Sequence, residues 1–221
     1  MKQSRSEQTR NNILNTAESL FVQYGYEGTS LRQLTSEAKV NLAAIHYHFG
    51  SKESLVHAVL KRRLEWINQE RLRILDELEH QAMGHPLKPS QIVDAFFGTL
   101  LRQAMNQDND NAIVLRLLAR TMSDPSRFIK TLFAQEHAEV IDRYKAALFK
   151  ALPGVPEAEI LWRFHFMLGA TSHALAGINV LREATDLDNA GQDHPAYDEN
   201  LLPRLMSFLL GGLRAPLPPI A

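Results

Sequence analysis

The stretch from residue 41 to residue 52 combines small, aromatic and basic side chains in an order that suits contact with DNA. A helix in the major groove needs small side chains where its backbone nears the bases, polar groups at the base edges, and donors at its flanks for phosphate oxygens. Ala43 and Ala44 are small enough for close approach, and His46 can exchange a hydrogen bond with a base edge. The expected donors to phosphate oxygens are Tyr47, His48 and Lys52. The stretch therefore predicts a recognition helix for double-stranded DNA.

Some of these aromatic side chains also have a structural interpretation. Tyr47 and Phe49 could pack into a core as well as approach DNA, and His48 suits either place.

A second short helix is expected directly upstream, over residues 31–38. Ser30 can cap its N-terminus, and Leu31, Leu34 and Ala38 recur at helical spacing. Arg32, near its start, could make a bidentate contact with a guanine, while Thr29 or Ser30 could bind a phosphate. With Asn41 at the positive end of the recognition helix, the full set of expected DNA contacts is Thr29, Ser30, Arg32, Asn41, Leu42, Ala43, Ala44, His46, Tyr47, His48 and Lys52.

Two helices this short cannot bury their apolar faces alone, so a third helix must lie behind them. Residues 7–24 supply it, since apolar residues recur there at helical spacing and Gly25 follows as a natural helix end. These apolar residues are Ile13, Leu14, Ala17, Leu20 and Phe21. The three helices together predict a helix-turn-helix domain.

The first sixty or so residues resemble the DNA-binding domain of the TetR/AcrR family of transcriptional regulators. The matching positions are Ile13, Leu14, Ala17, Leu20, Phe21, Gly25, Tyr26, Thr29, Ser30, Ala38, Val40, Tyr47, His48, Phe49, Lys52, Glu53 and Leu55. Two positions depart from the family pattern: His46 stands where Tyr is usual, and Gly50 where Lys is frequent. The first leaves the base contact at that position open, and the second removes one phosphate contact.

The charge is distributed in agreement with a DNA reader, although the net charge of the chain is only −1. Up to Arg63 the chain has nine basic and five acidic residues, whereas the remainder has 15 basic and 20 acidic residues. A positive lobe beside an acidic body keeps the body away from phosphates. The basic run at residues 61–63, taken alone, predicts only a solvated helix face.

The composition excludes several other classes of protein. The chain of 221 residues has no cysteine, which excludes thiol catalysis, disulfides and cysteine-ligated zinc. It has no apolar stretch of about 18 residues and no apolar signal core near its start, so we expect a cytoplasmic protein without a membrane contact. No cofactor or metal is expected.

The fold class expected for the whole chain is all-α, because no strand-like alternation of any length occurs. The expected domains are a helix-turn-helix domain at 1–51, a helical ligand-binding and dimerisation domain at 52–215, and a Pro-rich tail at 216–221. Loops are expected at 106–111 and 186–197. The helices expected after residue 51 span about 52–81, 89–106, 112–122, 124–151, 156–183 and 198–213.

The last two expected helices are rich in large apolar and small residues, which by composition alone could be ordinary core. The family resemblance implies that they form a four-helix dimer seam, and a dimer would present two recognition helices to a palindromic operator. The expected interface residues are Phe164, Leu168, Thr171, Leu175, Leu205, Phe208 and Leu209.

The resemblance also implies a ligand-responsive regulator, most simply a repressor that a small apolar effector releases from its operator; an activator would have the same sequence features. The segment 160–170, with Arg116 to Leu118, further resembles the subgroup that senses fatty acids or acyl-CoA esters. Candidate residues lining the effector pocket, each of which could also be plain core, are Trp66, Phe96, Phe97, Leu100, Leu118, Met122, Phe133, His137, Phe166 and His173.

Two alternative functions rest on weaker features. Residues 77–80 form a Glu-x-x-His, the spacing of carboxylate-bridged di-iron bundles, but no second copy occurs and no other catalytic motif is present, so we expect no enzyme. A helical lipid-binding module that no longer reads DNA is the other alternative. Arg32, Tyr47, His48 and Lys52 favour the DNA reader over that module.

Overall fold

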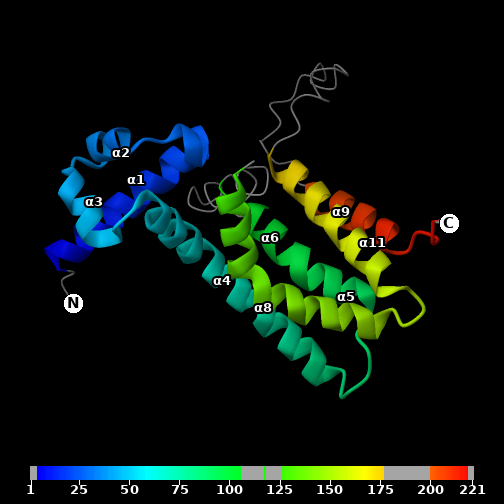
Figure 1. Cartoon of the computed structure of the whole chain (residues 1–221). Coiled ribbons are helices and arrows are strands. Elements are labelled where there is room, and N and C mark those ends of the chain that lie inside the picture. Colours follow the sequence, from blue (N-terminus) through cyan, green and yellow to red (C-terminus); the bar gives the residue numbers. More distant parts are fainter. Residues whose placement is uncertain (1–3, 106–116, 118–125, 177–199, 219–221) are drawn as a thin grey trace. The chain divides into compact units, whose positions relative to one another are not determined.

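The described parts of the chain form α-helices and one π-helical turn, as the computed structural model in Figure 1 shows. It describes residues 4–105, 117, 126–176 and 200–218. The expected all-α class is confirmed for these ranges. The elements are α1 (Arg5–Gly28), α2 (Leu31–Ala38), α3 (Leu42–Phe49), α4 (Lys52–Gln81), α5 (Pro89–Val93), the π-helical η1 (Asp94–Gly98), α6 (Thr99–Met105), α8 (Arg127–Ala151), α9 (Glu157–Ala176) and α11 (Leu201–Leu213).

Most expected helices have their counterparts here, and α4 has the expected bounds. The helix expected at 89–106 is interrupted by the π-helical turn η1. The expected loops at 106–111 and 186–197 and the helix at 112–122 fall outside the described residues, apart from Leu117, which is helical. None of the helices in the described ranges is long and apolar enough to cross a membrane.

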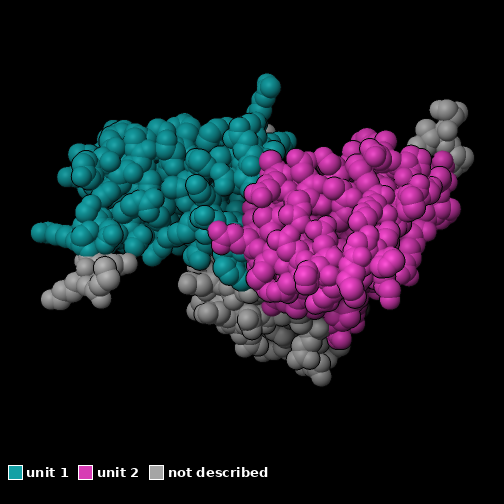
Figure 2. Space-filling view, turned by 90° about the horizontal axis from the view of Figure 1, so that it is seen from below, with its two compact units in different colours: residues 1–66, 112–137 teal, residues 67–111, 138–221 magenta. Residues whose placement is uncertain are grey.

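Two compact units make up the chain, coloured separately in Figure 2. Unit 1 comprises residues 1–66 and 112–137, and unit 2 comprises residues 67–111 and 138–221. This division differs from the expected domain boundary at residues 51 and 52, because the first half of α4 belongs to unit 1. Its inward residues are fully buried there, namely Leu55, Val56, Val59, Leu60 and Leu64.

Helix α1 begins with a capping box formed by Ser4 and Glu7, three residues before the helix start expected from the sequence. The Ser4 hydroxyl accepts a hydrogen bond from the backbone N–H of Glu7 at 3.2 Å, and the Ser4 N–H donates to the Glu7 carboxylate at 3.0 Å. The regular helix is broken at Gly25, whose φ of 75° lies in the left-handed region that glycine adopts without strain. Local sequence therefore fixes both limits of the helix that supports α2 and α3.

A buried carboxylate joins α1 to α4. Glu18 is only 2% exposed, and its oxygens receive hydrogen bonds from Arg62 Nη2 at 2.5 Å and Arg63 Nε at 2.9 Å. Arg62 also donates to the Asn15 side chain at 2.9 Å. The basic run at 61–63 is therefore not simply a solvated face, because two of its three members hold α4 against α1.

The C-terminal helix of the described chain is held by Arg163 of α9. Its Nε donates to Glu159 at 2.7 Å, and its Nη1 donates to the carbonyl of Leu213 at 2.7 Å. Nη2 lies 3.4 Å from the carbonyl oxygen of Pro216, so the beginning of the Pro-rich segment is also tied to α9. Arg163 thus satisfies carbonyls that the end of α11 would otherwise leave unpaired.

The Glu18 pairing predicts a marked loss of stability in Glu18→Gln. The amide cannot neutralise both guanidinium groups, which are themselves partly buried, so we expect the free energy of unfolding to fall by about 3 kcal/mol. Urea denaturation followed by circular dichroism measures this. Glu37→Gln, at an exposed position of α2, is the matched control and should change stability by less than about 0.5 kcal/mol. Equal denaturation midpoints for the two variants would contradict the role given to Glu18.

Candidate nucleic-acid interface

Side-chain caps define the two short helices α2 and α3. The Ser30 hydroxyl accepts from the Gln33 N–H at 3.1 Å, and the Asn41 carbonyl oxygen accepts from the Ala44 N–H at 2.8 Å. Lys39 ends α2 in the left-handed conformation, with a φ of 53°. Gly50 ends α3 with a φ of 77°. The expected capping roles of Ser30 and Asn41 are therefore confirmed.

The turn between α2 and α3 is fastened to α1. Asn12 Nδ2 donates to the carbonyl of Ala38 at 2.7 Å, and this carbonyl belongs to the last residue of α2. Ile45 of α3 is completely buried, and Leu34 of α2 is 1% exposed. One face of each short helix is thus fixed in the core of unit 1, so the opposite face of α3 is left to solvent.

The exposed face of α3 carries the side chains expected to meet DNA. Leu42 is 48% exposed and Tyr47 is 81% exposed, while Ala43 and His46 are also exposed. These four positions are spaced i, i+1, i+4 and i+5, which places them on one side of a helix. Ala44, His48 and Phe49 are half-buried. The core interpretation of Phe49 therefore applies in part, whereas Tyr47 is not a core residue.

His46 is oriented by the end of its own helix. Its Nδ1 lies 2.8 Å from the carbonyl oxygen of Gly50. Because a carbonyl oxygen can only accept, Nδ1 carries the hydrogen, and in the neutral ring Nε2 is then the acceptor. An exposed acceptor suits the amino groups of adenine or cytosine in the major groove.

Lys52 is held at the start of α4 by an aromatic ring. Its Nζ lies 4.2 Å from the centre of the Tyr26 ring, and the Tyr26 hydroxyl donates to Glu53 at 3.0 Å. Burial first, and then the hydrogen bond to Glu53 and its charge, raise the pKa of Tyr26 to about 12. Tyr26 therefore stays protonated at neutral pH, and the Lys52 ammonium group is positioned without being neutralised by a phenolate.

Thr29 does not join this surface. It is 1% exposed, and its hydroxyl donates to the carbonyls of Gly25 at 2.8 Å and Leu20 at 3.3 Å. The hydroxyl closes the turn after α1, so we leave Thr29 out of the contact surface. Ser30 and Arg32 are exposed at the start of α2, and Asn41 is exposed at the start of α3.

The expected effector-pocket residues do not all lie together. Phe96, Phe97 and Leu100 are buried in unit 2, whereas His137 is buried in unit 1. Phe166 is 64% exposed and His173 is exposed, so both lie on the outer side of α9 and not in the interior of the described part of unit 2. Trp66 is 49% exposed. Leu118, Met122 and the side chain of Phe133 lie outside the described residues.

The expected dimer residues are mostly core residues of unit 2. The buried ones are Phe164, Thr171, Leu175, Leu205 and Leu209, whereas Leu168 is half-buried and Phe208 is 68% exposed. Most of the α9 residues expected at the interface lie on the inward side of this helix, which has apolar residues on both sides. Its outward side carries Leu161, Trp162, His165, Phe166, Gly169 and His173. The spacing of these outward residues, i, i+1, i+4, i+5, i+8 and i+12, could have identified them as one stripe.

The acidic residues near the Glu-x-x-His segment are engaged in ion pairs. Glu77 pairs with Arg73, and Asp76 and Glu79 both accept from Arg143 Nη2, at 2.5 and 2.9 Å. Among the described residues, no group of three or more His, Cys, Asp or Glu side chains could hold a metal ion. Asp76 and Glu79 thus link α4 to α8 within unit 2.

Comparison with known proteins gives two family matches. Residues 13–59 match the family described as "Bacterial regulatory proteins, tetR family". Residues 94–212, more than half of the chain, match the family described as "Tetracyclin repressor-like, C-terminal domain".

Individual relatives match over parts of the chain. The A-factor receptor protein of Streptomyces griseus is 35% identical over 69 residues, which is 31% of this chain and 25% of that protein. The HTH-type transcriptional repressor NicS of Pseudomonas putida is 34% identical over 74 residues, 34% of this chain and 35% of that protein. The chain thus spans only about a quarter to a third of these relatives.

Solved structures match over nearly the whole chain at low identity. The reduced form of NemR from Escherichia coli aligns with a TM-score of 0.57 and 18% identity, covering 91% of this chain and 95% of that one. This likeness shows the fold.

Substitutions at Asn41 should separate its capping role from its expected contact with DNA. Asn41→Ala removes the acceptor for the Ala44 N–H, so we expect a loss of about 1 kcal/mol in stability. Asn41→Asp keeps the cap but adds a negative charge beside the exposed face of α3, and should weaken DNA binding without destabilising the protein. Thermal unfolding and fluorescence anisotropy with labelled DNA measure the two effects. Unchanged DNA binding by a folded Asn41→Asp variant would remove Asn41 from the interface.

Proposed function

Since the chain belongs to the TetR family of bacterial transcriptional regulators, we propose that it is a homodimeric repressor whose α3 helix reads a palindromic operator. The observation that carries this proposal is the exposed face of α3, whose opposite face is fixed in the core by Ile45. Exposure of apolar surface as large as that of Leu42 and Tyr47 to water is unfavourable, which favours a macromolecular partner for this face.

The proposed contacts fall into two groups. Arg32, Ala43, Ala44 and His46 meet base edges, where they determine sequence preference. Phosphate contacts set the register of the protein on the duplex. These proposed phosphate contacts are Ser30, Asn41, Tyr47, His48 and Lys52, with Leu42 packing against the groove wall.

The dimer is proposed to form through the exposed sides of α9 and α11. Trp162 is 59% exposed, Phe166 is 64% exposed, and the two rings stack with their centres 5.7 Å apart. Phe208 projects from α11 beside the exposed Gly211 and Gly212, which permit close approach of another helix. Two copies of this surface would form a four-helix seam, and a dimer supplies the second half-site reader.

Release from DNA is proposed to follow the binding of a small apolar effector in unit 2. Helix α4 begins beside the recognition helix in unit 1 and continues into unit 2, so an effector that prefers one arrangement of α4 would shift the position of Lys52 and α3. The relative NicS is a transcriptional repressor, which supports repression over activation for this chain. A fatty acid or an acyl-CoA ester is the effector class that we propose.

Two substitutions test the DNA-binding proposal. Lys52→Ala should weaken binding to all sequences alike and reduce the slope of log affinity against log salt by about 1, because one phosphate contact is lost. Arg32→Ala should also relax the preference at one base pair, with a cost of about 1–3 kcal/mol for the specific site. Anisotropy titrations with DNA from upstream of the gene, in a salt series, measure both.

The matched control is Lys61→Ala, which removes the same charge nine residues further along α4 and should leave the salt slope unchanged. If Lys52→Ala and Arg32→Ala both bind like the parent, the proposed docking of α2 and α3 is wrong. If the parent protein binds upstream DNA and unrelated DNA with equal affinity, the proposal of a sequence-specific regulator is contradicted.

A charge in the proposed seam should dissociate the dimer. Trp162→Glu would bury a carboxylate against its symmetry mate, so we expect the dissociation constant of the dimer to rise by about a hundredfold or more. Sedimentation velocity at several protein concentrations measures it. Met83→Glu, at an 87% exposed apolar residue on a turn, is the control and should leave the mass unchanged. A dimer that persists in Trp162→Glu would place the interface elsewhere.

A further inference from the structure

Arg71 is a charged residue in the interior of unit 2. It lies on α4, is 4% exposed, and donates from Nε to the carbonyl of Phe96 at 2.9 Å. Its guanidinium carbon lies 3.8 Å from the centre of the Phe96 ring. The backbone carbonyl of Arg71 accepts from the buried Tyr144 hydroxyl at 2.8 Å. The position of this guanidinium is thus fixed by α4, η1 and α8 together.

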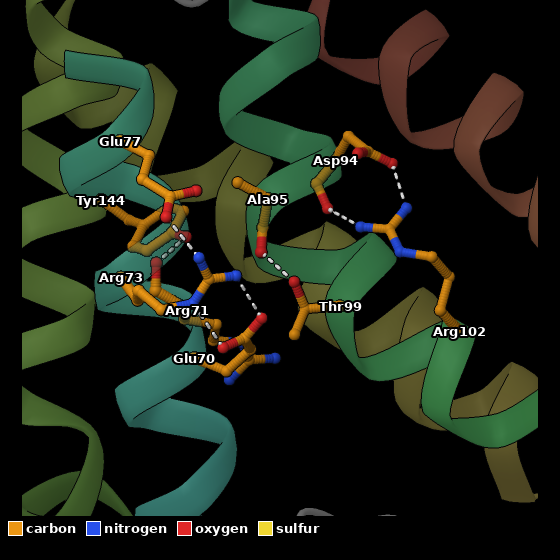
Figure 3. Close-up of polar contacts among 9 residues, drawn as sticks. All are labelled: Glu70, Arg71, Arg73, Glu77, Asp94, Ala95, Thr99, Arg102 and Tyr144. Atoms are coloured by element: carbon orange, nitrogen blue, oxygen red, sulfur yellow. Dashed lines mark hydrogen bonds and ion pairs between the residues drawn. The ribbon is translucent and has the colours of Figure 1, made fainter. Parts of the chain in front are cut away.

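No carboxylate in the described part of the chain pairs with Arg71. The acidic residues on nearby turns have other partners, as Figure 3 shows: Glu70 and Glu77 both pair with Arg73, and Asp94 pairs with Arg102 at 2.9 Å. Burial lowers the pKa of the Arg71 guanidinium to about 10, so the group is still charged at neutral pH. A buried cation without a counter-charge is strongly destabilising, which indicates a partner other than these acids.

A structural role alone does not account for an arginine here. Bonding the Phe96 carbonyl needs one N–H group, whereas a guanidinium has five donors. The described residues provide no hydrogen-bond acceptor for the terminal nitrogens Nη1 and Nη2. Phe96 itself belongs to the π-helical turn η1, and such turns are frequent at functional sites.

The surroundings of Arg71 are mainly aromatic. The Phe96 ring contacts Phe97, Phe164 and Tyr144, with ring centres 4.8, 5.0 and 5.1 Å apart. A single charged group among aromatic side chains is the ordinary lining of a small-molecule site.

We infer that Arg71 binds the carboxylate of a small apolar effector held in unit 2, through its two terminal nitrogens. A carboxylate matches the guanidinium in a bidentate geometry and neutralises its single charge. A phosphate dianion would instead leave one negative charge buried. This inference rests on the proposed function, because it names the chemical class of the proposed effector.

The test compares linear carboxylates with the alcohols of the same length, from butanoate and butanol to dodecanoate and dodecanol, on the full chain. Melting temperature against ligand concentration gives apparent affinities. We expect the best carboxylate to bind about tenfold tighter than its alcohol, the difference that a charge-assisted hydrogen bond produces. Arg71→Gln should abolish the difference.

The control is Arg73→Gln, which removes an equal charge from an exposed position of the same helix and should keep the tenfold difference. Arg71→Lys, which retains the charge, should keep a weaker carboxylate preference and serves if Arg71→Gln does not fold. Three results would each overturn the inference. The carboxylate and the alcohol could bind with equal affinity, no carboxylate could give a saturable shift in melting temperature, or the preference for the carboxylate could survive in Arg71→Gln.

DNA binding by the same protein preparations is measured separately. A protein that binds its operator but does not prefer carboxylates overturns only this inference. Carboxylate preference without DNA binding would instead overturn the proposed function.

Discussion

The buried carboxylate of Glu18 is the interaction on which the rest of unit 1 depends. It joins two arginines of α4 to α1, and α1 in turn holds the end of α2 through Asn12. Helices of eight residues such as α2 and α3 are not stable alone in water. Their positions, and that of Lys52 at the start of α4, therefore follow from how α1 and α4 are held together.

The same division of faces recurs in both units. In α3 the inward face is closed by Ile45 while Leu42 and Tyr47 remain in solvent. In α9 the inward face packs in unit 2, and Trp162 and Phe166 remain in solvent. Large apolar side chains that a single chain leaves exposed on a rigid helix are the usual sign of an interaction surface. One of these surfaces suits a nucleic acid and the other a second copy of the chain.

The buried charges of Glu18 in unit 1 and Arg71 in unit 2 have different surroundings. In unit 1 the buried Glu18 is compensated by two arginines, so its charge contributes to cohesion. Within the described residues of unit 2, the buried Arg71 contacts a carbonyl and an aromatic ring but no carboxylate, because Arg73 and Arg102 engage the nearby acids. A compensated charge holds helices together, whereas an uncompensated one favours an anionic ligand.

The sequence by itself determined the helices, their caps and the helix-turn-helix arrangement. Ser30 and Asn41 as caps, Gly25 as the break in α1 and the bounds of α4 all depend on neighbours within four residues. Only the tertiary structure decided that Thr29 is buried, that Arg62 and Arg63 meet Glu18, and that Phe164 faces inward while Phe166 faces outward. The physical reason is that α9 is apolar on both sides and ion pairs join residues more than forty positions apart. Periodicity cannot reveal which face another helix will cover, because that depends on packing between distant segments.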